Sequence, residues 1–150
     1  MTNPHKINSK APLLGDYKLY FDIDTRWMDN DIYGHVNNVV YYSYFDTIVN
    51  RFLIENAGLD IRKGTEIGLM VSSQCHYYSG IAFPDKLIGA FGVNKVGNSS
   101  VEYNLAIFKE NEERASAKGI LTHVFVDRST HKPLRIAGLL RQALTEAILV

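Results

Sequence analysis

Between a strand-like and a helix-like segment, the chain reads Arg26-Trp27-Met28-Asp29-Asn30-Asp31-Ile32-Tyr33-Gly34-His35-Val36-Asn37-Asn38. This run combines acidic and amide side chains with a glycine and a histidine. The first backbone N–H groups of a helix lack partners within the helix and carry partial positive charge. A carbonyl oxygen that develops negative charge would be stabilised there. The run therefore predicts a place where carbonyl chemistry can be done.

The segment after this run has the periodicity of a long helix, from residue 39 to residue 57. Its apolar residues recur at spacings of three and four, and they are Tyr41, Tyr44, Phe45, Ile48, Val49, Phe52 and Leu53. Asn37 or Asn38 is a suitable N-cap, and Gly58 stands where a left-handed residue is expected after the last turn. So broad an apolar face predicts a central helix enclosed by a sheet.

Strand-like patterns lie on both sides of this helix. Residues 17–26 alternate in polarity, and four further strands are expected at 68–78, 86–96, 100–109 and 115–127, separated by turn-like breaks. A short C-terminal helix is expected at 136–149. Hairpin-linked strands imply an antiparallel sheet. The pattern predicts an α+β domain at 17–150, with five to six strands curled around one helix, preceded by a flexible leader at 1–16.

Composition limits the possible functions. The chain has 150 residues, 46% of them hydrophobic, with 16 basic and 16 acidic side chains. A net charge of zero disfavours binding to nucleic acid or to an anionic membrane, and it mildly favours self-association. Cys75 is the only cysteine, which excludes an internal disulfide and favours a reducing compartment. No apolar run approaches the ~18 residues of a membrane span, so a cytoplasmic protein is expected.

The motif and its context resemble the hotdog-fold acyl-CoA thioesterases of the 4-hydroxybenzoyl-CoA thioesterase type. The resemblance runs from about residue 17 to residue 140. Weaker support comes from the strand at 71–77, the hairpin at 97–100 and the turn between residues 126 and 133. The main carriers are Asp31, Gly34, His35, Val36, Asn37, Asn38, Tyr41, Tyr44 and Phe45.

This resemblance implies hydrolysis of an acyl-CoA thioester at an interface between two subunits of a homodimer or homotetramer. By position, Asp31 is the catalytic carboxylate, and a backbone N–H near Asn38 holds the thioester oxygen. Asp31 either attacks the carbonyl or deprotonates a water molecule, and both routes stay open. His35 is counted with the catalytic residues, where it would orient the catalytic groups or bind substrate. The alternative is a buried histidine that donates to a backbone carbonyl.

Substrate contacts are expected from the motif and from the later matching segments. Coenzyme A carries phosphates, so basic side chains at the pocket mouth are expected, with Lys95 as a further candidate. The four other histidines lack the spacing of a metal site, so neither a metal nor another cofactor is expected. The expected contacts are Tyr33, Gly34, Asn37, Tyr41, Ser99, Ser100, Arg128 and Lys132.

Several alternatives stay open at this point. Asp29 is expected to support the loop, and Asp46, on the polar side of the helix, is a second candidate for the acid. Tyr33 stands where thioesterases acting on acyl carrier protein have asparagine, which favours coenzyme A as the carrier. A non-catalytic acyl-CoA or lipid-binding regulator and a hydratase or dehydratase are the alternative functions on this fold.

Overall fold

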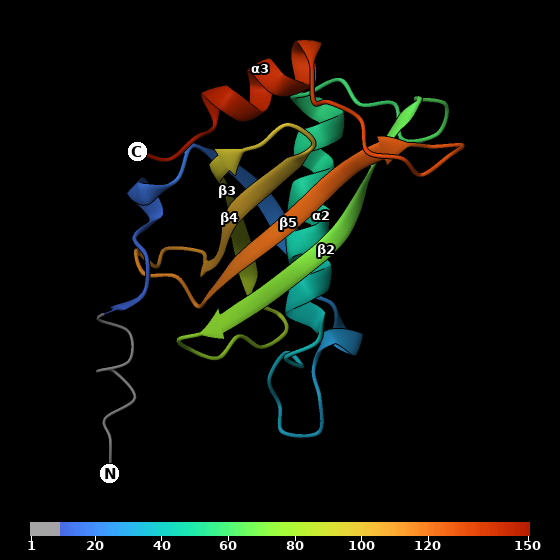
Figure 1. The fold of residues 1–150 in the computed structure, drawn as a ribbon. Coiled ribbons are helices and arrows are strands. Elements are labelled where there is room, and N and C mark those ends of the chain that lie inside the picture. Colours follow the sequence, from blue (N-terminus) through green and yellow to red (C-terminus); the bar gives the residue numbers. More distant parts are fainter. Residues whose placement is uncertain (1–9) are drawn as a thin grey trace.

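The computed structural model describes residues 10–150, which form one antiparallel sheet of five strands and two α-helices. The sheet has the order β1-β3-β4-β5-β2, and it curves around α2 (Figure 1). This is the hotdog arrangement that the sequence predicts. In chain order the elements are β1 (Leu19–Asp24), α2 (Val40–Glu55), β2 (Glu66–Tyr77), β3 (Lys86–Val96), β4 (Ser100–Lys109), β5 (Ala117–Asp127) and α3 (Gly138–Glu146).

Helix α2 lies against the concave face of the sheet because its apolar side is broad. All seven residues predicted to form that side are buried. Phe52 stacks on Phe91 of β3 with ring centroids 4.0 Å apart, and Phe45 is fully buried. Burying a Phe, Ile or Leu side chain contributes roughly 1.5–3 kcal/mol. The central position of the helix therefore follows from its amphipathic pattern.

The start of α2 differs from the prediction that Asn37 or Asn38 is its N-cap. The N-cap position belongs to Val39, whose side chain cannot accept a hydrogen bond. Asn37 instead accepts the Val39 N–H on its side-chain oxygen, at 3.0 Å, because a tight turn precedes the helix. At the other end, Gly58 has φ of +67°, as predicted for a left-handed residue.

Residues 10–16 belong to the folded domain. Ala11 is buried, Leu13 pairs with Arg114, and a short 3₁₀ helix runs from Leu14 to Asp16. Together with Tyr17 this segment covers part of β3 and β4 on the face opposite α2. The remainder of the expected flexible leader, residues 1–9, lies outside the described residues.

Strand β2 is an exposed edge of the sheet, paired within residues 10–150 only with β5. It is 12 residues long, most of its side chains are exposed, and Glu66 is its one carboxylate. Leu69, Met70 and Val71 are 38, 38 and 58% exposed. A long apolar edge strand is a template for pairing with another chain.

Candidate active site

The predicted site loop, residues 26–38, is held against the segment at 79–85. The Val36 N–H donates to the Ile81 carbonyl at 2.7 Å, and the Phe83 N–H donates to Oδ1 of Asn30 at 3.0 Å. The ring of Trp27 meets Phe83 edge to face. These contacts come from residues about 45 or more positions apart in the chain, and they give the loop one defined path from β1 to α2.

Asp31 occupies a tight turn inside this loop. Its backbone N–H donates to the His35 carbonyl, and its carbonyl accepts from Gly34, which has φ of +83° and so favours glycine. Carboxylate atom Oδ1 accepts the Tyr33 N–H at 2.9 Å. The side chain is half-exposed, and Oδ2 has no hydrogen-bond partner among residues 10–150. One carboxylate oxygen therefore positions the side chain and the other is free.

The N-terminus of α2 presents a free amide at the predicted position. Asn37 accepts the N–H groups of Val39 and Val40 on its side-chain and backbone oxygens. The Asn38 N–H has no partner among the described residues. The carbonyl of Asn38 accepts the Tyr77 hydroxyl at 2.9 Å, which orients this peptide. A helix N-terminus carries partial positive charge, so this amide is suited to bind an oxyanion.

His35 and Tyr33 are exposed in this chain. The ring of His35 lies over Gly80, where a Cβ would come within 3.0 Å of it. The interpretation of His35 as a buried histidine is therefore wrong. Tyr33 is 83% exposed, and Ile32 beside it is 93% exposed. The loop therefore exposes large apolar side chains to solvent.

Tyr41, a predicted substrate contact, is 3% exposed and packs edge to face on Tyr77 at 5.0 Å. Burial raises its pKa to about 12, so it stays neutral at ordinary pH. Cys75, on the same strand as Tyr77, is half-buried, and burial raises its pKa to about 11. A thiol in this state is a poor nucleophile.

A cavity of about 430 Å³ lies between the polar side of α2 and strand β2. Asp46 is on its wall and exposed, with Ser43 one turn earlier on the helix. The wall combines apolar and polar side chains, as pockets for small organic groups do. Its lining residues are Tyr42, Ser43, Asp46, Met70, Ser73 and Leu121.

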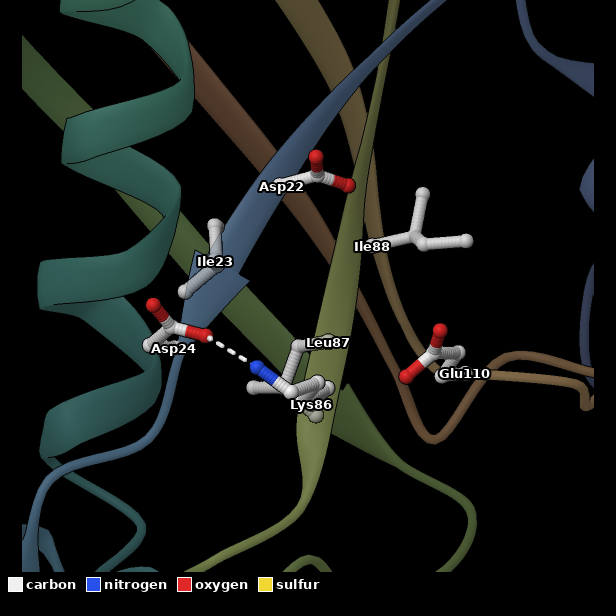
Figure 2. A pocket seen from close by; sticks show the side chains of 7 residues that line it. All are labelled: Asp22, Ile23, Asp24, Lys86, Leu87, Ile88 and Glu110. Atoms are coloured by element: carbon white, nitrogen blue, oxygen red, sulfur yellow. Dashed lines mark ion pairs between the residues drawn. The ribbon is translucent and has the colours of Figure 1, made fainter.

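A second cavity, of about 280 Å³, lies where β1 meets β3 (Figure 2). Its rim carries the carboxylates of Asp22, Asp24 and Glu110 and a single basic side chain, Lys86, whose Nζ is 3.6 Å from Asp24. The excess of negative charge disfavours a polyphosphate. A third, of about 260 Å³, lies between α2 and α3 beside Phe52. Neither contains a predicted site residue.

Comparison with known proteins identifies the family. The sequence profile of the thioesterase-like superfamily matches residues 25–144. The chain belongs to this superfamily. The match starts one residue before the site loop, so the superfamily region contains the loop, α2 and every strand after it. No curated protein matches the chain.

Solved structures show the same fold. The PA5185 protein of Pseudomonas aeruginosa is 50% identical with a TM-score of 0.91, covering 93% of this chain and 97% of that chain. The 1,4-dihydroxy-2-naphthoyl-CoA thioesterase of Synechocystis has 12% identity and a TM-score of 0.76, with coverages of 85 and 95%. The BH1999 gentisyl-coenzyme A thioesterase has 19% identity and a TM-score of 0.74, with coverages of 84 and 99%. The last two share the fold.

Within one chain of this superfamily protein, the predicted residues fall into two groups. The first group, around Asp31 and Asn38, lies at the end of β2 near Tyr77, which pairs with Ala117. The second group lies beyond Val124. Val124 is seven residues after Ala117 on β5, so the two groups are roughly 23 Å apart along the strand. Figure 1 shows the loop before α2 at one end of that helix and the turn between β3 and β4 at the other. The second group consists of Ser99, Ser100, Arg128 and Lys132.

Each of these four residues makes hydrogen bonds within the chain. Arg128 donates from Nε to the Gly64 carbonyl and from Nη2 to the Ile61 carbonyl, both at 2.7 Å. Its guanidinium thereby fixes the loop before β2. Ser99 accepts the Phe125 N–H on its backbone carbonyl. Ser100 and Lys132 likewise accept the Gly97 and Asp127 N–H groups on their backbone carbonyls, and Lys132 is exposed.

Sequence reasoning did not predict the hydrogen bonds of two tyrosines that shape the site. Tyr44 donates its hydroxyl to Asp29, and Tyr77 donates to Asn38, 39 residues away. The spacing of Tyr44 on α2 indicates only that its ring is buried. Among residues 10–150, no group of His, Cys, Asp and Glu is arranged to bind a metal, and no helix there is long and apolar enough to span a membrane.

Proposed function

We propose that this protein hydrolyses acyl-CoA thioesters to the free acid and coenzyme A. The observation that carries the proposal is the free Asn38 N–H at the start of α2, in the same loop as an Asp31 carboxylate with one free oxygen. Superfamily membership supports the same reaction class. The amide stabilises the oxyanion that forms when the thioester carbonyl is attacked.

Asp31 supplies the reactive carboxylate in this proposal, by one of two routes. As nucleophile, it forms a mixed anhydride and expels the thiolate of coenzyme A, and water then cleaves the anhydride. As general base, it removes a proton from water while the water attacks the carbonyl. In a single turnover in ¹⁸O-labelled water, label in the Asp31 carboxylate requires the anhydride.

The test of the reaction is release of free thiol from a panel of aromatic, short-chain and long-chain acyl-CoA substrates. Asp31→Asn should lower kcat by about 10²- to 10⁴-fold, the usual contribution of a general base, while acyl-CoA still binds. Asp46→Asn tests the alternative acid on α2. A larger loss of kcat in this variant than in Asp31→Asn would assign the catalytic role to Asp46. Binding of acyl-CoA by the wild type without thiol release would refute hydrolysis and favour the regulator.

We further propose that the active unit is at least a homodimer paired along β2. An exposed apolar edge strand favours pairing with another chain. The site loop and the start of α2, close to Tyr77 of β2, expose further apolar surface at Trp27, Ile32, Tyr33 and Val39. Antiparallel pairing of two β2 strands about a two-fold axis places the Glu66 end of one copy beside the Tyr77 end of the other. Lys132 of the second copy then comes toward the site loop of the first.

Two variants with matched exposure test the dimer. Val71 on β2 is 58% exposed and Leu139 on α3 is 57% exposed. Val71→Lys should shift the protein to monomer in gel filtration and abolish thiol release, whereas Leu139→Lys should leave both unchanged. A fully active monomer would contradict the proposal.

The proposed phosphate contact has its own readout. Lys132→Ala should raise KM for an acyl-CoA more than for the matching acyl-pantetheine, which lacks the nucleotide phosphates. Lys95→Ala, at the other candidate lysine, provides the comparison. Equal KM changes with both substrates would assign Lys132 to the solvated surface.

A further inference from the structure

Asp29 is the buried carboxylate of the site loop. Its side chain is fully buried, while that of its ion-pair partner Arg26 is 61% exposed. Carboxylate Oδ2 accepts the Tyr44 hydroxyl at 2.6 Å and the Arg26 backbone N–H at 2.9 Å. Oδ1 accepts from Nε of Arg26 at 3.0 Å and lies 2.9 Å from its Nη2. Every bond is charge-assisted, and such bonds are the strong ones.

These contacts keep Asp29 ionised. Burial acts to raise its pKa, but the hydrogen bonds from Tyr44 and Arg26 outweigh it and lower the pKa below the ordinary value. A buried charge is costly unless it is paired in good geometry. The Asp29 carboxylate has four donors from two residues, and these compensate its buried charge only while the loop keeps its present conformation.

The backbone of Asp29 connects the same carboxylate to the oxyanion amide. The Asp29 carbonyl accepts the Asn37 N–H at 2.9 Å, and Asn38 is the next residue. Asp31 follows Asp29 by two positions. Asp29 therefore contacts the start of the loop at Arg26, its end at Asn37 and the second turn of α2 at Tyr44.

We propose that Asp29 is a positioning residue: through Tyr44 and Arg26 it fixes the loop on α2, so that Asp31 and the Asn38 amide act on the same carbonyl. This inference rests on the proposed function. Asp29 itself has no access to substrate, because the residue is 1% exposed. Its effect on turnover passes through the placement of its neighbours.

Loss of the Asp29 contacts should affect kcat, because it displaces catalytic groups. Displacing a catalytic group by about 1 Å can cost ~100-fold in rate, because the reacting atoms lose their near-attack arrangement. Lys132, the proposed phosphate contact, is not among the hydrogen-bond partners of Asp29. Loosening the loop should therefore lower kcat and leave KM nearly unchanged.

The experiment compares Asp29→Asn and Tyr44→Phe with Tyr103→Phe. Tyr103 is fully buried and donates or accepts one hydrogen bond with His123, so its variant removes a buried phenol outside the site. Thiol release is measured per folded molecule, below the unfolding temperature of each variant. We expect Asp29→Asn to lose about 10- to 100-fold in kcat, with KM changed less than about twofold. Tyr44→Phe should show a smaller loss, and Tyr103→Phe none.

The outcomes separate this inference from the proposed function. If the wild type is active and Asp31→Asn is inactive, but Asp29→Asn and Tyr44→Phe retain kcat per folded molecule, positioning is refuted and hydrolysis stands. A fall in unfolding temperature without a fall in kcat also refutes it, because a purely stabilising ion would behave that way. If Asp29→Asn does not fold, Tyr44→Phe decides alone by the presence or absence of a kcat loss.

Discussion

His123 is a buried histidine that should make this protein sensitive to acid. It is on β5, 4% exposed, and its Nδ1 lies 3.1 Å from the Tyr103 hydroxyl. Phe125 meets the ring edge to face, and the backbone of Gly68 on β2 lies so close that a Cβ there would be 2.7 Å from Nδ1. None of these groups is charged, so nothing here compensates a protonated imidazole.

Burial lowers the pKa of His123 from 6.5 to about 4. The neutral form is favoured in the folded protein, so between these two pKa values the unfolded chain binds more protons than the folded one. The stability contributed by neutral His123 is therefore fully present above pH 6.5, is lost progressively as the pH drops toward 4, and changes no further below that. One pKa unit is worth about 1.4 kcal/mol, and the lost stability amounts to roughly 3 kcal/mol.

Urea unfolding at fixed protein concentration measures this loss. Between pH 7 and pH 4.5 the wild type should lose about 2 kcal/mol more than His123→Gln, which cannot titrate. The two proteins differ only at position 123, so the difference between their curves isolates His123. Two parallel curves of stability against pH would refute the reasoning, because they would mean that the imidazole is protonated or solvated in the folded state.

Three further predictions concern packing in the core and the hydrogen bonds of Arg128. Gly89→Ala adds a Cβ 2.6 Å from two Ile48 carbons and should destabilise the fold by about 1–3 kcal/mol, and an unchanged urea midpoint would contradict this. Phe45→Ala should cost about 3–5 kcal/mol, measured in the same way. Arg128→Ala should speed amide exchange at 60–65 and leave α2 protected, whereas uniform protection would show that this loop does not depend on the guanidinium.

Local patterns were enough to predict the fold. The strands at 86–96 and 100–109 agree with β3 and β4 to the residue, because the Gly97-Asn98 turn marks the hairpin between them. The helix prediction extends past α2 by one residue at its start and two at its end. Alternation, helical spacing and turn residues are properties of neighbouring positions, so a single sequence carries them.

Contacts between distant residues were not predictable in this way. Leu13 pairs with Arg114, about one hundred positions away, and this pairing places residues 10–16 in the domain instead of a leader. Arg128 was expected at the substrate, but its partners are the carbonyls of a loop more than 60 residues earlier. Nothing in the local pattern of either segment indicates its partner.

The two aspartates of the site loop show this limit most clearly. Asp29 and Asp31 are two positions apart, in the same polar stretch, and have the same chemistry. Tertiary contacts separate them: Asp29 is enclosed by Arg26 and by Tyr44, 15 residues later, while Asp31 keeps one oxygen free. A fully bonded carboxylate can orient its neighbours but cannot take a proton or attack a carbonyl without losing those bonds. The free oxygen of Asp31 has no such cost, and for that reason the reactive role belongs to Asp31 in our proposal.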